Sequence, residues 1–444
     1  MLSSPSVGRH LLAAGLFFLF ATSGCGDDAA GTPPVYTPAV KLLVFSDPHY
    51  FDPSLGTTGA AFAKYIATDR KLIAESDAIM RAMVGIVAAE KPEVVLVSGD
   101  LTKDGELLSH QSAAAYLRQM KAYNRRVFVV PGNHDIQNGG ASSYAGDTAT
   151  PVPAISAAQF AEIYQDLGFG DALARDASSL SYVADLAPGL RLLALDSCTY
   201  GDTRGSMITS GQFRDDTRTW IKGQLDEARR LGLRVIAMMH HGLVEHFDKQ
   251  ALIFPEFLIN DRDGVAGLLS NGGVGAIFTG HFHANDITRG WPSGAASSIF
   301  DIETGSAVTY PCPYRTVALA SDTLAITTKH VAAIDYDLHG AVDFPTYAHD
   351  DLRRGLEGLI TNLVEAPPYA LPADEATTLS PWLGDGLVAH YAGDEVLPAS
   401  VDTEAHTLTS SAGFVEQLAG TMLRSIYSDL PPADNTVTLD LTAR

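Results

Sequence analysis

Five short segments of the sequence carry side chains of the kinds that bind metal ions or move protons. In chain order they are Asp47-Pro48-His49, Gly99-Asp100, Gly132-Asn133-His134-Asp135, His240-His241 and Gly280-His281-Phe282-His283. Each segment alone is more typical of a turn, a helix cap or a buried histidine. Carboxylate, amide and imidazole groups without a thiolate suit Mn, Fe, Zn and similar divalent ions. The five segments together therefore predict a metal centre.

Each of these segments follows a short apolar stretch that is typical of a buried strand. The predicted strands are Lys41–Ser46, Glu93–Ser98, Arg126–Val130, Leu190–Asp196, Arg234–Met239 and Gly275–Thr279. Amphipathic patterns predict helices over Asp69–Lys91, Gly105–Ala122 and Gly211–Leu231. Strands that alternate with helices indicate an α/β domain. Since ligands bind beyond the carboxyl ends of such strands, we expect the five segments to converge on one crevice.

The pattern changes after residue 290. Strands are expected at Ser297–Ile302, Arg315–Ala320 and Thr323–His330, and their close succession predicts a second, more antiparallel sheet. Beyond about residue 336 the sequence is mainly helical and punctuated by proline, with helices expected near Asp350–Val364 and Gly413–Tyr427. We therefore predict a main domain over residues 40–335 and an accessory, mainly helical region over residues 336–444.

The N-terminus has the features of an export signal. An apolar run of 11 residues, Leu11–Ala21, follows a basic residue and is too short to cross a membrane, which takes about 18 residues or more. Thr22-Ser23-Gly24-Cys25 then resembles a bacterial lipoprotein signal. We expect a signal peptide over residues 1–24, lipid on Cys25, and a flexible tether over residues 25–39. A plain secretory signal with an incidental cysteine is the alternative. Either way the protein is expected to be exported, and with lipid it would be anchored to the membrane surface of the cell envelope.

Charge and cysteine content narrow the possible partners. The chain has 52 acidic and 30 basic side chains and a formal net charge of −22, so no nucleic-acid-binding surface is expected. An anionic substrate would need local positive charge, such as metal ions. With Cys25 lipidated, Cys198 and Cys312 remain, and they either form a disulfide or stay as unpaired thiols.

The order of the five segments resembles the calcineurin-like metallophosphoesterase superfamily over about residues 41 to 330. The resemblance implies a two-sheet β-sandwich flanked by helices in four α/β/β/α layers, here with a C-terminal helical extension, and two divalent metal ions of Mn, Fe or Zn type. The implied ligands of the first ion are Asp47, His49, Asp100 and His283. Asp100 would bridge to the second ion, which Asn133, His240 and His281 would complete. His134 would lie beside the substrate phosphate without binding a metal.

This arrangement makes chemical sense for phosphate esters. Two ions about 3.5–4 Å apart clamp a phosphoryl group during in-line displacement, with a bridging hydroxide as the expected nucleophile. Their charge would exceed that of the ligand carboxylates and attract a small anionic substrate. His134 would donate a proton to the leaving oxygen or stabilise its charge.

One of the five segments indicates which class of phosphate ester is the expected substrate. The stretch Gly99–Gly105 looks more like bacterial phosphodiesterases of the cyclic-nucleotide type than like protein phosphatases or purple acid phosphatases. We therefore expect phosphodiester hydrolysis, with a phosphomonoesterase or nucleotidase, or a non-catalytic surface-binding lipoprotein, as alternatives. Three further residues stay open. His241 either reaches the substrate or points to the side opposite His240, as alternate residues of an extended backbone do. Asp135 either orients His134 or caps the following turn, and Arg315 is either a phosphate contact or structural.

Overall fold

The structure, a computed structural model, describes residues 39–67, 69–122, 124–201, 207–295, 297–367 and 369–442. The predicted signal peptide, Cys25 and the tether up to residue 38 lie outside the described residues. Within these ranges, no helix combines the length and the hydrophobicity needed to cross a bilayer.

The first sheet has six strands in the order β15-β14-β13-β1-β2-β3. Its strands are β1 (Val40–Phe45), β2 (Val94–Val97), β3 (Arg126–Val129), β13 (Pro313–Ala320), β14 (Thr323–His330) and β15 (Thr436–Asp440). The pairs β1–β2 and β2–β3 are parallel, whereas β13, β14 and β15 add antiparallel strands at the other side of β1. The segments after β1, β2 and β3, which the sequence analysis predicts to bind metal, consequently leave the sheet at the same end.

The second sheet has seven strands in the order β11-β12-β10-β9-β8-β7-β6. Its strands are β6 (Ala174–Arg175), β7 (Tyr182–Ala187), β8 (Leu190–Ala194), β9 (Arg234–Met238), β10 (Val274–Thr279), β11 (Asp286–Gly290) and β12 (Ile299–Glu303). Strands β8, β9, β10 and β12 are parallel. A short pair, β4 (Ser142–Ser143) with β5 (Thr150–Pro151), stands apart.

The expectation that the strands after residue 290 form a sheet of their own is wrong. β12 pairs in parallel with β10 in the second sheet, whereas β13 and β14 join the first sheet beside β1. The side chains of β12 are all buried, as in a central strand, while β14 alternates between buried and exposed positions, as in a sheet with one solvated face. Closeness in sequence therefore did not decide which sheet each strand joined.

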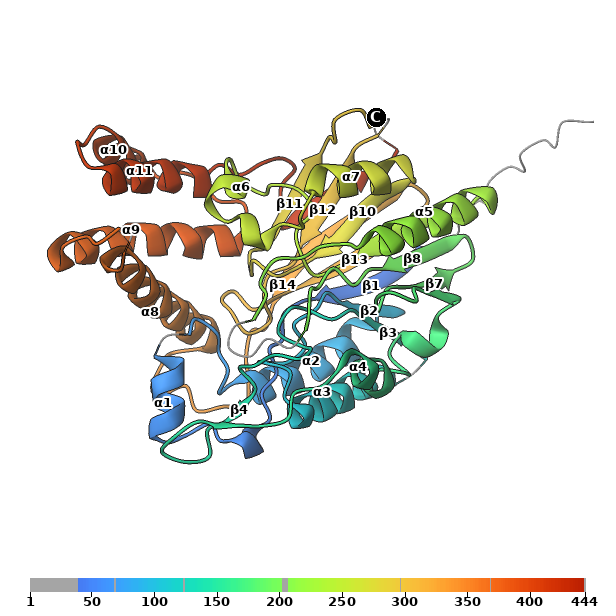
Figure 1. The fold of residues 1–444 in the computed structure, drawn as a ribbon, viewed down its shortest axis with the longest axis horizontal. Coiled ribbons are helices and arrows are strands. Elements are labelled where there is room, and N and C mark those ends of the chain that lie inside the picture. Colours follow the sequence, from blue (N-terminus) through green and yellow to red (C-terminus); the bar gives the residue numbers. More distant parts are fainter. Residues whose placement is uncertain are drawn as a thin grey trace, which may run out of the picture. The chain divides into compact units, whose positions relative to one another are not determined.

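Helices cover the outer faces of the two sheets (Figure 1). On the first sheet lie α2 (Ser76–Glu90), α3 (Leu107–Met120) and α4 (Ala157–Ile163), and on the second lie α5 (Asp215–Arg230) and α7 (Arg262–Asn271). One apolar core contains residues of both sheets, such as Phe45 and Phe278, together with Met83 of α2. A second core lies between the second sheet and α5 with α7. These layers confirm the predicted four-layer sandwich.

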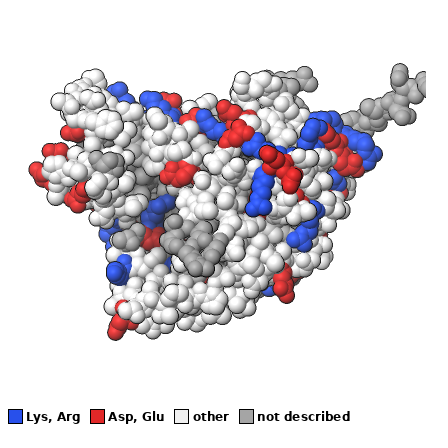
Figure 2. Space-filling view, in the orientation of Figure 1, with Lys and Arg blue, Asp and Glu red and all other residues white. Residues whose placement is uncertain are grey.

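The outer face of α5 carries acidic and basic side chains in alternation (Figure 2). Lys222 pairs with Asp226, and Arg230 pairs with Glu227, while Ile221 faces the second core. Charges of both signs on one helix are typical of a solvated surface.

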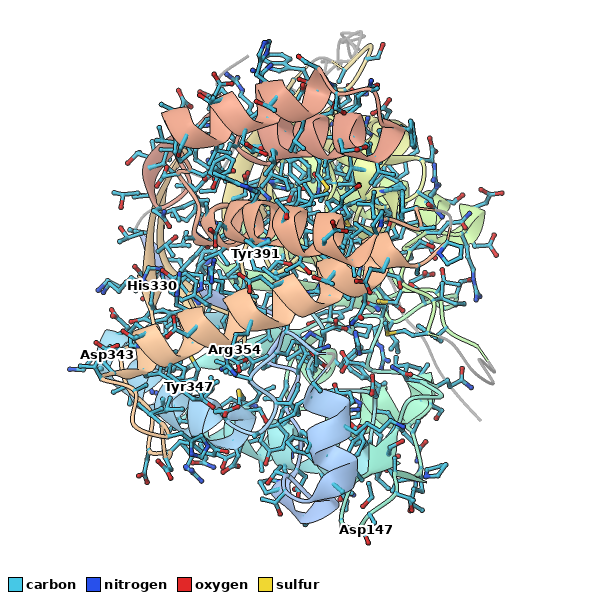
Figure 3. The ribbon with its side chains drawn as sticks, turned by 90° about the vertical axis from the view of Figure 1, so that its left-hand side faces the viewer. Asp147, His330, Asp343, Tyr347, Arg354 and Tyr391 are labelled. Atoms are coloured by element: carbon cyan, nitrogen blue, oxygen red, sulfur yellow. The ribbon has the colours of Figure 1, made fainter. Side chains whose placement is uncertain are left out.

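The C-terminal region contains α8 (Phe344–Glu365), α9 (Ala373–Ala392), α10 (Ala399–Thr409) and α11 (Phe414–Ile426). Figure 3 shows these helices stacked on one another, with Tyr347 and Arg354 marking α8 and Tyr391 marking α9. They share an apolar core with Phe247 and Phe282 of the main domain. Two short helices, α1 (Ala60–Ile66) and α6 (Gln250–Ile253), complete the set of described α-helices. β15, which follows α11, returns to the first sheet, so this region is joined to the main domain by both a core and a strand.

Candidate metal centre

The predicted ligands lie directly after strands, and the backbone there is unusual. Five of these non-glycine residues have left-handed conformations, with φ of 50° at Asp47, 35° at His49, 45° at Asp100, 77° at His281 and 72° at His283. Such conformations cost roughly 1–3 kcal/mol each and persist only where the surroundings enforce them. Their concentration at one edge of the sandwich marks this edge as a functional site.

Asp47, His49 and His283 form the first group of ligand-type side chains. His49 Nε2 lies 3.1 Å from His283 Nε2, and Asp47 Oδ1 lies 3.9 Å and 3.6 Å from these two nitrogens. Thr309 Oγ1 lies 3.2 Å from His283 Nδ1 and thereby orients the ring. Among the described residues, Asp47 Oδ1 has no hydrogen-bond partner although it is buried. A buried oxygen beside two imidazole nitrogens is a suitable position for a cation.

The second group contains Asp100, His240 and His281. His240 Nε2 lies 3.4 Å from Asp100 Oδ2 and 2.9 Å from Asn133 Oδ1. His240 Nδ1 donates to the Ser98 carbonyl at 3.0 Å, which leaves Nε2 as the nitrogen that can bind a metal. The His281 ring lies 4.6 Å from the His240 ring, measured between centroids.

Asp100 lies between the two groups. Its Oδ2 is 3.6 Å from His49 Nε2 of the first group and 3.4 Å from His240 Nε2 of the second, while Oδ1 accepts from the His134 backbone N–H at 2.9 Å. Gly132 allows this approach, because a Cβ at that position would collide with Asp100 Oδ1 and with the Asp100 backbone nitrogen. One carboxylate thus faces both groups, as a bridging ligand must.

The protonation states fit metal ions. Burial lowers the pKa of His49 and of His283, so both rings are neutral and have lone pairs to offer. Burial raises the pKa of Asp47 to about 6. Burial opposes ionisation of Asp100 as well, but the positive charge of His240 holds its pKa well below the ordinary value. Burial opposes protonation of His240, but Asp100 raises the pKa of His240 to about 9, so a bound metal ion would take the place of its Nε2 proton. Without that proton, all ligands of the two groups are anionic or neutral, as divalent ions require.

His134 lies beside His49 and Asp100, close enough for the three to form a further group of ligand-type side chains, but its ring is also bonded to residues outside both ligand groups. Its Nδ1 lies 2.6 Å from the Lys103 carbonyl and 2.9 Å from Asp104 Oδ1, and its Nε2 lies 3.9 Å from Asp100 Oδ2. Burial opposes protonation, but Asp100 and Asp104 together raise the pKa of His134. The sequence did not single out Asp104 as the partner of His134, although Asp104 lies within the Gly99–Gly105 stretch.

Asp135 and His241 have structural roles. Asp135 does not orient the His134 ring, because its carboxylate accepts from the backbone N–H groups of Gly132, Leu101 and Thr102, and so fastens two of the site's turns together. His241 Nδ1 lies 2.8 Å from Ser197 Oγ, and its Nε2 lies 2.9 Å from the Thr209 carbonyl. Both nitrogens are therefore engaged, and the ring packs 4.5 Å from that of His281.

Arg315 is a structural residue. It is fully buried, and its guanidinium donates to the backbone carbonyls of Asp434, Asp286 and Glu303. Of the two alternatives left open for Arg315, the structural one is therefore confirmed and the phosphate contact is excluded. The two cysteines in the described part of the chain, Cys198 and Cys312, are free thiols, so they do not form the disulfide that the sequence had left open.

Comparison with known proteins gives a consistent result. The family model described as calcineurin-like phosphoesterase matches residues 40–285. The 3′,5′-cyclic adenosine monophosphate phosphodiesterase CpdA of Haemophilus influenzae is 34% identical over 105 residues, which are 22% of this chain and 31% of that protein. The match thus spans about a third of this relative's length.

Solved structures are similar at low identity. A dimetal phosphatase from Danio rerio has a TM-score of 0.46 and 18% identity, covering 66% of this chain and 97% of that chain. A purple acid phosphatase from yellow lupin (Lupinus luteus) seeds has a TM-score of 0.43 and 11% identity, covering 67% of this chain and 52% of that chain. The family model alone matches more than half of the sequence and includes all five segments of the site. The protein belongs to the calcineurin-like phosphoesterase family.

Proposed function

We propose that this protein is a dinuclear-metal-dependent hydrolase of phosphate esters that prefers phosphodiesters. The observation that carries the proposal is the position of Asp100, whose Oδ2 lies between an Asp/His group and a His/Asn group. A carboxylate shared by two ligand groups is what a pair of adjacent metal ions requires. We assign Asp47, His49, Asp100 and His283 to one ion and Asp100, Asn133, His240 and His281 to the other.

Two bound divalent ions would supply Lewis acidity and an activated water for in-line displacement at phosphorus. The chain's own residues supply the remaining parts of the reaction. His134 offers a proton at Nε2 to the leaving oxygen, since its Nδ1–H is already committed to Lys103 O and Asp104 Oδ1. The Asp104 carboxylate fixes the ring and stabilises its protonated form. His134 is thus positioned as an acid for poor leaving groups.

Local positive charge supports an anionic substrate. Burial is the main cause of the low pKa of His283, and the nearby charges of Arg70 and Lys71 lower it further. Lys71 likewise adds to the effect of burial on the pKa of His49. We infer that these two cations help to hold the substrate phosphate near the first ligand group. The overall net charge of −22 is then no obstacle to binding.

Two observations favour diesters over monoesters. The Gly99–Gly105 stretch resembles phosphodiesterases of the cyclic-nucleotide type, and a cyclic-nucleotide phosphodiesterase is among the relatives of the chain. Cyclic AMP is a phosphodiester with a ribose leaving group, which benefits from a proton donor such as His134. Cyclic nucleotides are therefore the first natural substrates to assay.

The proposal is tested with purified protein that has been stripped of metal and reloaded with Mn²⁺. Rates on bis-p-nitrophenyl phosphate, p-nitrophenyl phosphate and 3′,5′-cyclic AMP are compared between wild type, Asp100→Asn and the surface control Asp263→Asn, whose side chain is 80% exposed. We expect faster turnover of the diesters, retained in the control and lost in Asp100→Asn. Faster turnover of p-nitrophenyl phosphate would instead indicate a monoesterase, and no turnover of any ester would favour a non-catalytic binding protein.

We also propose that the protein is an exported lipoprotein anchored through Cys25, on the basis of the short apolar run and the residues before that cysteine. In a bacterial host, a labelled fatty-acid analogue should be incorporated into wild type and not into Cys25→Ser. Incorporation into neither protein would contradict lipidation and leave a plain secretory signal.

A further inference from the structure

A second set of ligand-type side chains lies where the helical region meets the second sheet. Asp286 begins β11, His390 lies near the end of α9, and Glu395 follows that helix; Figure 3 marks the neighbouring Tyr391. Asp286 and His390 are fully buried, and Glu395 is 6% exposed. Asp286 is more than a hundred residues away from His390 and Glu395 in the sequence, and these three residues share no member with the ligand-type groups of the candidate metal centre.

The three side chains point ligand atoms at one another. His390 Nδ1 lies 2.7 Å from Glu395 Oε1 and 4.0 Å from Asp286 Oδ2. Two ligands of one tetrahedral ion with bonds of about 2.1 Å lie about 3.4 Å apart, a value between these two distances. Small rotations of the carboxylates would therefore bring all three groups to bonding distance of one ion.

Hydrogen bonding leaves one oxygen of each carboxylate without a partner. Asp286 Oδ1 interacts with His246 Nδ1 at 2.7 Å and accepts from Thr288 Oγ1 at 3.0 Å. Within the described residues, Asp286 Oδ2, Glu395 Oε2 and His390 Nε2 are buried and lack any hydrogen-bond partner. Burying such groups unpaired costs about 1–3 kcal/mol each. A simple His390–Glu395 ion pair would satisfy only one oxygen, so it does not account for the whole cluster.

The surrounding charge favours a cation. His246, which orients Asp286, also lies 3.2 Å from Asp301 Oδ2 and 3.5 Å from Glu303 Oε2, so its charge is shared among three carboxylates. Buried charges are stable when they are paired or bind a metal. Arg315, the other buried cation beside Asp286, donates to its backbone carbonyl, so Asp286 Oδ2 and Glu395 Oε2 keep lone pairs that neither cation engages.

We propose that Asp286, His390 and Glu395 bind a structural divalent metal ion, separate from the catalytic pair. One imidazole and two carboxylates suit an ion such as Zn²⁺ or Mn²⁺. The ion links α9 and the segment after it to β11, and it thereby holds the helical region against the main domain. His246 positions the Asp286 carboxylate for the ion, as hydrogen-bonded neighbours of metal ligands commonly do.

The test uses full-length protein and Zn²⁺ or Mn²⁺ alone as the probe. Metal content per chain is measured for wild type, Asp100→Asn, His390→Gln, Glu395→Gln and the control His349→Gln, a partly exposed histidine on α8 that lies outside all ligand groups of the described residues. We expect Asp100→Asn to retain one ion after both catalytic sites are impaired. His390→Gln and Glu395→Gln should each bind one ion fewer than wild type, keep phosphoesterase activity, and no longer gain thermal stability from added Zn²⁺. The control should match wild type.

The outcomes separate this site from the proposed function. Asp100→Asn protein that binds no ion would overturn the third site even if the His390 variant fails to fold. An unchanged metal count and an unchanged Zn²⁺-dependent Tm in Glu395→Gln would show a buried ion pair only. Wild-type protein that hydrolyses none of the esters would count against the phosphoesterase proposal, but it would not change the metal content expected for this cluster.

Discussion

Replacing His134 by alanine removes the side chain that we propose as the proton donor to the leaving group. The ring donates through Nδ1 to Lys103 O and Asp104 Oδ1 at 2.6 and 2.9 Å, which leaves Nε2, 3.9 Å from Asp100 Oδ2, as the nitrogen for the proposed proton transfer. A general acid contributes about 10²–10⁴-fold, or about 2.7–5.5 kcal/mol of barrier. We expect this full loss in kcat for cyclic AMP, whose ribose leaving group is a poor one.

The loss should be smaller for bis-p-nitrophenyl phosphate, because p-nitrophenolate hardly needs a proton to depart. A second variant, Asp104→Asn, keeps the ring and weakens one charge-assisted hydrogen bond to it. Such a bond is worth about 1.5–3 kcal/mol, so a loss of about 10- to 150-fold is expected on cyclic AMP. Asp104→Asn thus measures what the orientation of the His134 ring contributes, whereas His134→Ala measures the effect of removing the ring.

The assay measures kcat and metal content of wild type, both variants and Asp263→Asn on the two esters. Both variants should keep their metals, since neither His134 nor Asp104 belongs to the assigned ligand set. Equal losses on the activated and unactivated esters would refute the acid role and leave electrostatic stabilisation only. Loss of metal from His134→Ala would show that it is a ligand.

The other predictions concern packing, pH and substrate charge. Gly132→Ala should lower metal content and activity, because its Cβ would collide with Asp100 Oδ1. Gly223→Ala is the control, because nothing lies within 4 Å of the added Cβ, and it should leave both unchanged. Equal metal content in the two variants would contradict this expectation. Burial lowers the pKa of His110 to about 3, so the folded state keeps its ring neutral while the unfolded chain takes up a proton below about pH 6.5. The free energy of unfolding should therefore fall as the pH drops from about 6.5 toward 3, by about 2 kcal/mol at pH 5. Denaturant titrations of His110→Gln should show a smaller fall over the same pH range than those of wild type. The same pH dependence in both proteins would contradict a buried, neutral His110. Lys71→Gln should raise KM about two- to fivefold with little change in kcat, and the effect should shrink at high salt; a fall in kcat alone would place Lys71 in the chemistry instead.

The sequence predicted the strands that carry the site better than it predicted their partners. β1, β2, β3, β8, β9 and β10 were expected within one or two residues of their observed ends, because continuous apolar runs between turn residues are typical of buried parallel strands. Pairing was missed because β13 reaches β1 from more than two hundred residues away, and local patterns do not record such contacts. β15 was missed for the same reason, since the sequence around it was expected to be helical.

Contacts between residues far apart in the sequence were also missed at the candidate metal centre. Residue types and strand ends were enough to assemble Asp47, Asp100 and the histidines near one another, because each lies directly after a strand. The bond between His134 and Asp104 was not predicted, since it depends on how two turns 30 residues apart face each other. The two alternatives for Arg315 could be decided only from the structure, because a sequence does not show which arginines are enclosed by backbone carbonyls.

In the proposed centre, two adjacent metal ions share the Asp100 carboxylate. Electron paramagnetic resonance of wild-type protein reloaded with Mn²⁺ tests this arrangement, because ions joined through a common ligand show an exchange-coupled signal. We predict a coupled Mn²⁺ pair in wild type and in Asp263→Asn, and loss of the coupling in Asp100→Asn. A spectrum of isolated Mn²⁺ ions in fully loaded, active wild-type protein would contradict the shared carboxylate and the dinuclear centre built on it.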